Sequence, residues 1–283
     1  MKRLATVLLA AGLTIGLAGT AEAKEVRPVE KSGRLVVAKT TTTVKPFAKR
    51  VPKTLVFGDS ITAWYNAKAG DAKQGWWAVV AGKTKTAVTT NAIAGSGVIM
   101  DWCNGGNLFG SEDRLSQIDK TRPDLIVVEV GRNDATKCIL NTPEGQSPFR
   151  ASTPAEQMVA YDTYVSTLVK RAAKNGIGPS RVYMFNAWGP GDVHSRASIL
   201  TAQRAAAKKY GIKFVEVRAM KGSECYDGTH PNRSGSLTLS GQFLAHSDFA
   251  SKVAYLSKRP LPERTLVRGS AYQTFHTSCH TDQ

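Results

Sequence analysis

From Thr54 onward, short apolar runs alternate along the chain with longer amphipathic segments. The spacing of apolar residues in the longer segments predicts helices near residues 74–82, 113–120, 154–175, 194–210 and 233–246. The apolar runs between them are TLVFG (54–58), TAVTTNAIAG (86–95), DLIVVEVG (124–131), RVYMFNAW (181–188) and IKFVEV (212–217). Strands that alternate with helices indicate an α/β fold with a parallel sheet covered on both faces.

The same pattern predicts one folded domain with a flank on each side. Residues 53–250 carry the alternating elements and form the expected domain. Residues 24–52 are expected to be a basic, Thr/Lys-rich tether, and residues 251–283 an irregular tail. Inside the domain, Thr153-Pro154 is typical of a helix start and Asn175-Gly176 of a helix end.

The first 23 residues are typical of an export signal. Lys2 and Arg3 precede an uncharged run from Leu4 to Ala21, and Ala21-Glu22-Ala23 then forms a small-residue cleavage pattern. A membrane anchor is the alternative, because the run approaches spanning length, but three glycines and three threonines dilute it. We therefore expect a cleaved signal peptide over residues 1–23, a secreted or extracytoplasmic protein, and no integral membrane anchor.

The chain is strongly basic, with a formal charge of +16. Nucleic-acid binding is one interpretation of such a charge, but the basic residues are scattered and form no recognisable nucleic-acid motif. No nucleic-acid partner is therefore expected. Attraction to anionic envelope polymers, or simple solvation of a basic surface, explains the charge as well. The sequence has no metal-ligand cluster, P-loop or dinucleotide fingerprint, so neither a metal nor a cofactor is expected.

Polar clusters follow the apolar runs. Ligands of an open parallel sheet bind beyond the carboxyl ends of its strands, so these clusters are expected to meet at one edge. In chain order they are GDSIT (58–62), AIAGSG (92–97), GRND (131–134) and DGTHPN (227–232). Each could be a turn or a helix cap by itself, but their joint order favours an active site.

Together these four segments resemble the blocks of the SGNH hydrolase (GDSL esterase/lipase) family. The resemblance runs from about residue 54 to residue 246. It implies a three-layer α/β/α sandwich with a five-stranded parallel sheet, the flavodoxin-like arrangement of that family. It also implies a cofactor-independent serine esterase that works through an acyl-enzyme.

The resemblance assigns a role to each block. Ser60 corresponds to the nucleophile, His230 to the base, and Asp227 to the acid that orients the imidazole. The oxyanion donors correspond to the Ser60 amide, the Gly95 amide and the Asn133 side chain. Gly95 is preferred to the neighbouring glycine of its block because its offset from the strand fits the family block better.

Other residues of interest receive weaker interpretations. Asp59 and Asp134 are expected to serve turn or loop geometry, and the remaining histidines to be surface or structural residues. Trp64, Trp102 and Trp188 follow predicted strands and could contact substrate or only pack, whereas Trp76 and Trp77 lie in a helical pattern and are expected to pack.

Export makes the four cysteines disulfide candidates: Cys103, Cys138, Cys225 and Cys279. Three pairings are possible, and the sequence cannot choose among them. The pairing Cys103–Cys138 with Cys225–Cys279 is favoured, because the first two cysteines follow neighbouring strand ends in the expected sheet. The second pair would fasten the tail beside the turn that carries Asp227 and His230.

The expected function is hydrolysis of short acyl esters, with acetyl groups on carbohydrate as the favoured substrate. The ester could belong to an acylated small molecule, a glycan or a lipid. The loops at the active edge are polar and glycine-rich, and no long apolar segment resembles a lipase lid. A generalist esterase, a lipase, and an acyltransferase acting on envelope glycans remain alternatives. A non-catalytic envelope-binding protein on a hydrolase scaffold is the alternative from another class.

Overall fold

The computed structural model describes residues 50–67, 72–101, 103, 108–139, 144, 146–190 and 196–259. Several predictions from the sequence lie outside these residues. They are the signal peptide, almost all of the tether, Trp102, Cys279 and the tail beyond residue 259. Among the described residues, no helix has both the length and the apolar character needed to cross a bilayer.

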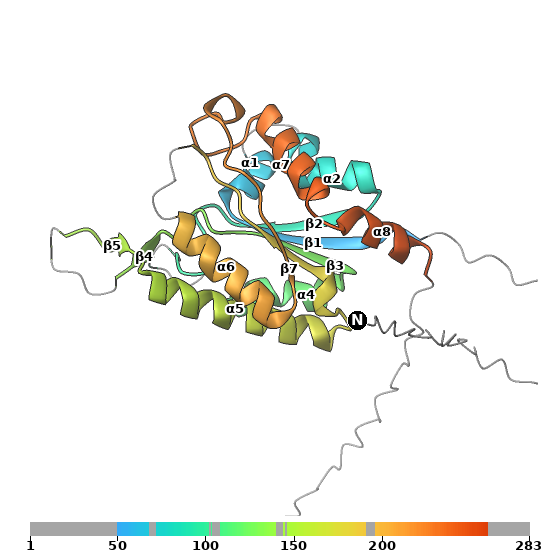
Figure 1. The fold of residues 1–283 in the computed structure, drawn as a ribbon, viewed down its shortest axis with the longest axis horizontal. Helices are drawn as coiled ribbons and strands as arrows, with labels where there is room; N and C mark the ends of the chain where they lie inside the picture. The colour runs from blue at the N-terminus through green and yellow to red at the C-terminus, as the bar shows by residue number, and fades with distance from the viewer. Residues whose placement is uncertain are drawn as a thin grey trace, which may run out of the picture. The chain divides into compact units, whose positions relative to one another are not determined.

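A five-stranded parallel sheet forms the centre of the domain (Figure 1). The strands stand in the order β2-β1-β3-β6-β7, and every neighbouring pair is parallel. This is the flavodoxin-like order, and it confirms the expected fold class. Their bounds are β1 Lys53–Gly58, β2 Ala87–Ala92, β3 Leu125–Glu129, β6 Val182–Phe185 and β7 Lys213–Val215.

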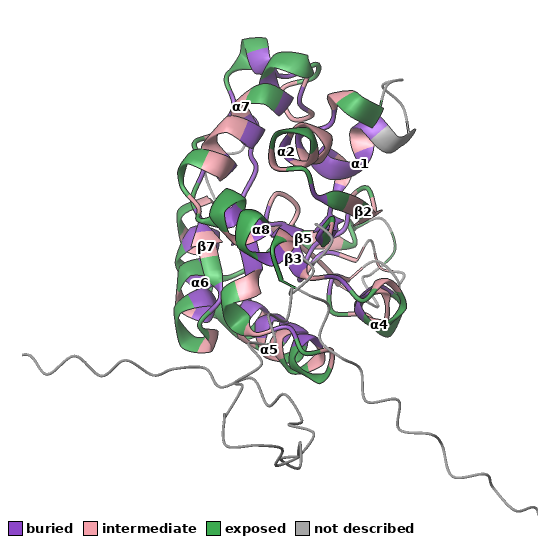
Figure 2. Cartoon of the chain, turned by 90° about the vertical axis from the view of Figure 1, so that its right-hand side faces the viewer, coloured by how far each residue is buried: buried purple, intermediate pink, exposed green. Residues whose placement is uncertain are grey.

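Helices cover both faces of the sheet (Figures 1 and 2). The lower face in Figure 1 is covered by α3 Glu112–Leu115, α4 Gln117–Thr121, α5 Pro154–Lys174 and α6 Arg196–Tyr210. The upper face is covered by α1 Ser60–Ala67, α2 Trp76–Thr84, α7 Arg233–Ala245 and α8 Phe249–Ser257. Short 3-10 helices occur at η1 Ala72–Gln74, η2 Pro179–Arg181 and η3 Gly222–Glu224.

Alternate residues of each central strand pack on opposite faces of the sheet. In β1, Leu55 and Phe57 belong to the core between the sheet and helices α5 and α6, while Val56 belongs to the core between the sheet and helices α2 and α7. In β3, Ile126 and Val127 divide in the same way. Both faces of the sheet are therefore buried. This explains why these strands are continuous apolar runs rather than alternating polar and apolar positions.

Two helix starts are fixed by side-chain caps, of which the one at Thr153 was predicted. Thr153 begins α5 with a reciprocal capping box to Glu156, and Pro154 occupies the first turn. Asn232 begins α7, because its side chain accepts a hydrogen bond from Gly235 N. The second cap matters for function, since Asn232 closes the DGTHPN block and fixes where that loop ends.

The first residues of the predicted irregular tail are helical instead. Residues Phe249–Ser257 form α8, whose Phe249, Val253 and Leu256 are buried against the sheet. Arg50 bonds to the end of this helix through Leu256 O and pairs with Asp124 at 2.8 Å. The packed domain therefore includes α8, because its apolar residues complete the core on the upper face.

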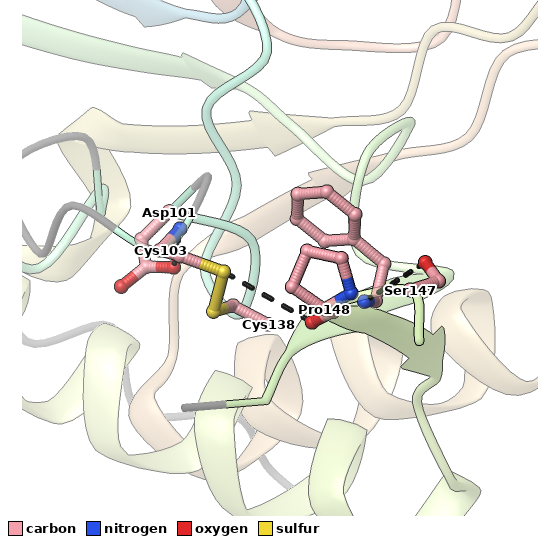
Figure 3. Close-up of a disulfide and its surroundings, with 6 residues drawn as sticks. Asp101, Cys103, Cys138, Ser147 and Pro148 are labelled. Carbon is pink, nitrogen blue, oxygen red and sulfur yellow. Dashed lines mark hydrogen bonds between the residues drawn. A yellow bond between two sulfur atoms is a disulfide. The ribbon is translucent and has the colours of Figure 1, made fainter. Parts of the chain in front are cut away.

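A two-stranded antiparallel hairpin, absent from the sequence prediction, follows β3. It consists of β4 Thr136–Cys138 and β5 Phe149–Ala151. A disulfide joins Cys103 to Cys138, with 5.3 Å between the Cα atoms (Figure 3). The pairing agrees with the prediction, but its reason was wrong, since β2 and β3 flank β1 and are not neighbours.

The second predicted disulfide stays a prediction, because Cys279 lies outside the described residues. Its proposed partner, Cys225, is buried and forms an isolated β-bridge with Pro231.

Candidate active site

The four polar blocks of the sequence meet around one cavity of about 360 Å³ at the carboxyl ends of β1, β2 and β3. This is the topological switch point of the sheet, where β2 and β3 lie on opposite sides of β1. The lining residues are Ser60, Ala63, Trp64, Ala94, Gly95, Arg132, Asn133, Asp227, Thr229 and His230.

Ser60 is the first residue of α1, two residues past the end of β1. The tight exit from the strand is held by Asp59, whose Oδ1 accepts a hydrogen bond from Ile61 N at 2.8 Å. Gly58 permits the turn because a Cβ there would lie 2.3 Å from the Thr62 side chain. The prediction that Asp59 serves the turn is confirmed.

Two buried carboxyl groups, those of Asp59 and Glu129, lie behind the serine. Both residues are fully buried. Oε2 of Glu129 accepts hydrogen bonds from Asp59 N at 3.2 Å and from Thr62 Oγ1 at 3.0 Å. Burial raises the pKa of Asp59 to about 6 and raises the pKa of Glu129 well above its usual value. Both carboxyl groups therefore keep a proton to higher pH than exposed acids do, and the hydrogen bonds to Glu129 tie α1 to the end of β3.

The loop after β2 places Gly95 on the cavity and Gly97 behind it. Gly95 has a φ of 75°, a left-handed conformation that glycine adopts without strain. A Cβ on Gly97 would lie 2.2 Å from Asp134 Oδ1, so this glycine allows close packing. Oδ1 of Asp134 accepts from Ile99 N at 2.8 Å, which confirms its expected role in loop geometry.

Asn133 reaches the cavity from the loop after β3. Its Nδ2 donates to Ser96 O at 2.9 Å and lies 3.3 Å from Asp59 Oδ2. The amide is thereby tied both to the loop after β2 and to the residue before Ser60. Its nitrogen is oriented by these two acceptors, and the longer contact is the weaker of the two.

A buried arginine that the sequence analysis did not single out braces the ends of β1 and β2. Arg114 of α3 donates to Gly58 O at 2.8 Å, to both oxygens of Asn91 at 2.9 Å, and to Ser96 Oγ at 2.7 Å. Its guanidinium carbon also lies 3.9 Å from the centre of the Phe109 ring. Burial lowers the pKa of Arg114 to about 10. The loops that carry Ser60 and Gly95 are thus fixed relative to each other.

Asp227 and His230 form a hydrogen-bonded pair within one tight turn. Asp227 Oδ2 lies 2.7 Å from His230 Nδ1, and Oδ1 accepts from His230 N at 2.8 Å and Thr229 N at 3.1 Å. Burial alone would raise the pKa of Asp227, but these hydrogen bonds outweigh it and lower the pKa to about 2. The carboxylate is therefore ionised at neutral pH and holds one nitrogen of the imidazole.

This turn is fastened to the domain by a second acid. Glu224 pairs with Arg218 at 2.6 Å and accepts from Thr238 Oγ1 of α7 at 2.8 Å. On the other side, Gly189 approaches the turn so closely that a Cβ would lie 1.8 Å from Gly228 O. The position of the Asp227–His230 pair therefore depends on a residue that has no side chain.

The tryptophans divide between the cavity and the core. Trp64 lines the cavity, and its ring stacks on His230 with centroids 4.5 Å apart and planes 12° apart. Trp188 is 1% exposed and packs in the core, the second of the two roles that the sequence left open for it. Trp76 is buried as expected and donates to Thr62 Oγ1 at 3.0 Å.

The described part of the chain contains no group of three His, Cys, Asp or Glu side chains placed to hold a metal ion. The chemistry available at the cavity is that of its own side chains: a hydroxyl, an imidazole paired with a carboxylate, and amide donors on the opposite wall.

Comparison with known proteins identifies the family. The model of the GDSL-like lipase/acylhydrolase family matches residues 56–236, which include all four polar blocks. The chain belongs to this family. As a GDSL family member it is a carboxylic ester hydrolase. No curated protein sequence matches the chain.

Solved structures share the fold of this GDSL hydrolase at low sequence identity. An acetyl xylan esterase, Est2A, from Butyrivibrio proteoclasticus is 12% identical, with a TM-score of 0.52 over 74% of this chain and 65% of its own. A family two carbohydrate esterase from Clostridium thermocellum, in complex with cellohexaose, is 18% identical, with a TM-score of 0.51 and the same two coverages. A family two carbohydrate esterase from Cellvibrio japonicus is 16% identical, with a TM-score of 0.51 over 73% of this chain and 63% of its own.

The first prediction concerns the close approach at Gly189. Because the added methyl group of Gly189→Ala would overlap Gly228 O, the turn that carries His230 must shift. We expect kcat/KM for p-nitrophenyl acetate to fall by about 10- to 100-fold, since small misplacements at a reacting centre are costly. Gly178→Ala is the matched control, because a Cβ there meets nothing within 4 Å. Wild-type activity in Gly189→Ala would contradict the prediction.

The second prediction concerns the acid behind Ser60. A carboxyl group whose pKa is raised by folding stabilises the fold most at low pH, and this contribution is lost as the pH rises through the folded pKa. Glu129→Gln keeps the acceptor for Thr62 but cannot ionise. We expect its free energy of unfolding, relative to wild type, to increase as the pH rises from about 4 to about 8.

Urea denaturation at a series of pH values measures this difference. Glu144→Gln, at an exposed position, is the control for the same change of charge. A stability difference between Glu129→Gln and wild type that stays constant across the pH range would show that Glu129 does not titrate as described.

Proposed function

We propose that this GDSL hydrolase is a secreted serine esterase that removes short acyl groups, with acetyl groups on carbohydrate as the favoured substrate. The observation that carries the proposal is the convergence of Ser60, the His230–Asp227 pair, Gly95 and Asn133 on one cavity. These residues come from four separate blocks of the sequence. A nucleophile, its base and oxyanion donors are the groups that acyl transfer requires.

In the first step, Ser60 Oγ attacks the ester carbonyl while Nε2 of His230 takes the hydroxyl proton. Asp227 accepts the Nδ1 proton of the ring at 2.7 Å, which selects the tautomer with a basic Nε2 and stabilises the imidazolium. Collapse of the tetrahedral intermediate breaks the bond to the alcohol oxygen, which leaves with the proton from His230. Water then attacks the acyl-Ser60 ester by the same route and releases the acid.

The tetrahedral intermediate carries a negative charge on the former carbonyl oxygen, which needs hydrogen-bond donors in the cavity. The amides of Ser60 and Gly95 and the Asn133 side chain are the proposed donors to this oxygen. Asn133 would donate to the oxyanion the Nδ2 proton that otherwise points to Asp59 Oδ2, at 3.3 Å, because this is the longer of its two contacts. Burial raises the pKa of Asp59 to about 6, so its carboxylate competes for that proton at neutral pH and competes less when it is protonated below that pH.

Trp64 supports the base rather than only the substrate. Ser60 and Trp64 are four residues apart on α1, so both side chains project from one face of the helix. The indole ring of Trp64 stacks on the face of the His230 imidazole. An aromatic face stabilises the imidazolium that forms in the first step, as it does other cations.

The size of the cavity supports a short acyl group. A volume of about 360 Å³ is near the lower end for small-molecule sites. It has room for an acetyl group and part of a sugar ring, and Trp64 offers an apolar surface for such a ring. The carbohydrate esterases that share the fold are consistent with this substrate class.

Export is supported by two features of the chain. The first 23 residues have the pattern of a signal peptide. The Cys103–Cys138 disulfide is also of a kind that persists in oxidising compartments.

The third prediction tests the nucleophile. Ser60→Ala should lower the hydrolysis of p-nitrophenyl acetate by about 10⁴-fold or more, as removal of a triad serine does elsewhere. A fluorophosphonate probe should label the wild-type protein at Ser60, as identified by peptide mass spectrometry, and should leave Ser60→Ala unlabelled. Labelling of another residue would refute this assignment.

The fourth prediction concerns chain length. Across p-nitrophenyl esters from acetate to palmitate, kcat/KM should be greatest at two to four carbons. A longer chain gains about 0.8 kcal/mol per buried methylene only where an apolar trough receives it. A maximum at octanoate or beyond would contradict the short-acyl proposal and favour a lipase.

A further inference from the structure

A row of exposed cations lies at the amino ends of three neighbouring strands, at the edge of the sheet opposite to the cavity. Lys85 precedes β2, Lys53 begins β1 and Arg122 precedes β3, and all three are exposed. These strands stand in the order β2-β1-β3, with about 5 Å between neighbours. Lys53 pairs with Ala87 of β2, and its carbonyl oxygen accepts a hydrogen bond from Asp124 N at 2.7 Å. Lys85 and Arg122 each come two residues before these partners, so the three cations are placed side by side.

Further basic residues surround this row. Lys83 and Lys120 lie in the last turns of α2 and α4, and Lys258 follows the end of α8. Arg50 fastens the end of α8 to this edge, because it bonds both to the last turn of the helix and to the loop before β3. We call the following exposed residues the basic edge: Lys53, Lys83, Lys85, Lys120, Arg122 and Lys258.

The acids at this edge are already paired. Asp124 forms an ion pair with Arg50 at 2.8 Å, and Asp119 forms one with Arg171. Among the residues that the structure describes, neither an ion pair nor a hydrogen bond joins a side chain of the basic edge to a carboxylate. The basic edge therefore presents positive charge that the fold itself does not neutralise.

Two cations of the basic edge occupy positions at which glycine is the usual residue. Lys85 has a φ of 59° and Arg122 a φ of 47°, so both end their helices in the left-handed conformation. This conformation costs free energy for residues with a Cβ, and helix ends of this kind favour glycine. Attraction to the negative helix ends offsets part of the cost, but Lys83 and Lys120 already supply it from the last turns. A partner outside the fold explains cations at these two positions better than helix stability does.

We propose that the basic edge binds a linear acidic polysaccharide and so holds the enzyme on such a polymer by the edge opposite to its cavity. The inference goes beyond the proposed function and does not depend on the chemistry of Ser60. Cations that stand about 5 Å apart along an open edge suit a chain with a charge on each unit, whereas a small anion needs a pocket. The basic character of the whole chain favours approach to such a polymer.

An anionic bilayer is the less favoured partner. Proteins that bind at a bilayer surface place apolar side chains beneath the headgroups. The large exposed apolar residues beside the basic edge are Val51 and Tyr255. The Tyr255 ring lies against Arg259, whose guanidinium carbon is 4.4 Å from the ring centre. So small an apolar surface leaves electrostatic attraction as the main source of binding at this edge.

A polymer bound at the basic edge leaves the cavity open. β1 has six residues and runs from Lys53 to Gly58, two residues before Ser60. At the rise of an extended strand, the basic edge and the nucleophile are about 20 Å apart. Hydrolysis of p-nitrophenyl acetate should therefore be unaffected by substitutions at the basic edge.

The experiment removes two charges from the basic edge and two from the cavity side of the full chain. The edge variant combines Lys85→Asn with Arg122→Asn, because asparagine tolerates the left-handed conformation. The control variant combines Lys221→Asn with Arg233→Asn, an exposed lysine and an exposed arginine near the Asp227–His230 turn. The sequence before Arg50 is the same in all variants, so its charges contribute equally.

Binding of fluorescently labelled polygalacturonate is measured by anisotropy at low and high salt. The edge variant should bind about 10-fold more weakly than wild type or worse, as expected for two basic residues at an anionic surface. The control variant should bind as wild type does, and high salt should weaken all binding. Exchange of the two cations, Lys85→Arg with Arg122→Lys, should keep the affinity. Thermal denaturation should show the edge variant to be as stable as wild type.

Several results would overturn the inference. Equal weakening in the edge and control variants would make general surface charge the cause, and unchanged binding in the edge variant would leave the basic edge without a role. Neutral dextran that binds as tightly as polygalacturonate would exclude recognition of charge. Tighter binding to phosphatidylglycerol vesicles than to polygalacturonate would make a bilayer the partner.

This proposal and the proposed function fail in different ways. If Ser60→Ala hydrolyses p-nitrophenyl acetate as wild type does, the proposed function fails, while polymer binding is untouched. If Ser60 is required but the edge variant binds polygalacturonate as wild type does, only the role of the basic edge fails.

Discussion

Three carboxyl groups, those of Asp59, Glu129 and Asp134, are buried directly behind the cavity. A buried carboxyl group is costly unless it is neutral or well hydrogen-bonded, so the segments that supply its donors are held in place. Glu129 takes donors from the start of α1, and Asp134 takes them from the loop after β2 and from Tyr161 of α5. The wall that carries Ser60, Gly95 and Asn133 is therefore fixed by the same acids whose burial raises their pKa.

On the opposite wall, which carries Asp227 and His230, folding lowers the pKa values of the acids instead of raising them. The Asp227 side chain is 47% exposed, and hydrogen bonds lower its pKa to about 2, as they do for Glu224. These two acids stabilise the fold above their unfolded pKa values, and their contribution is lost as the pH falls through about 2. Asp59 and Glu129 contribute most at low pH and lose that contribution as the pH rises. At neutral pH, Asp227 and Glu224 thus contribute fully to the stability of the turn that carries His230. The buried acids behind Ser60 have by then lost part of their stabilising contribution.

Much of this arrangement could be predicted from the sequence, because parallel strands place their carboxyl ends at one edge. That rule located the cavity from four polar blocks. The buried charged residues behind the cavity were harder to predict from the sequence. Glu129 left a signal, as a lone acid in the apolar run LIVVEV, whereas Arg114 lies in an ordinary polar segment and becomes buried only in the tertiary structure. Trp188 follows a strand as the polar blocks do, but strand position alone does not say that its ring turns into the core.

Local spacing sets the geometry within each wall, and side chains also make contact across the cavity. Ser60 and Trp64 are four residues apart on one helix, and Asp227 and His230 are three apart in one turn. Across the cavity, Trp64 stacks on His230, and Arg132 bonds to Thr229 at 3.4 Å. Stacked rings can slide at little cost, and a hydrogen bond of this length is weak. The adjustable part of the site therefore lies between two rigid walls, where the substrate itself must fit.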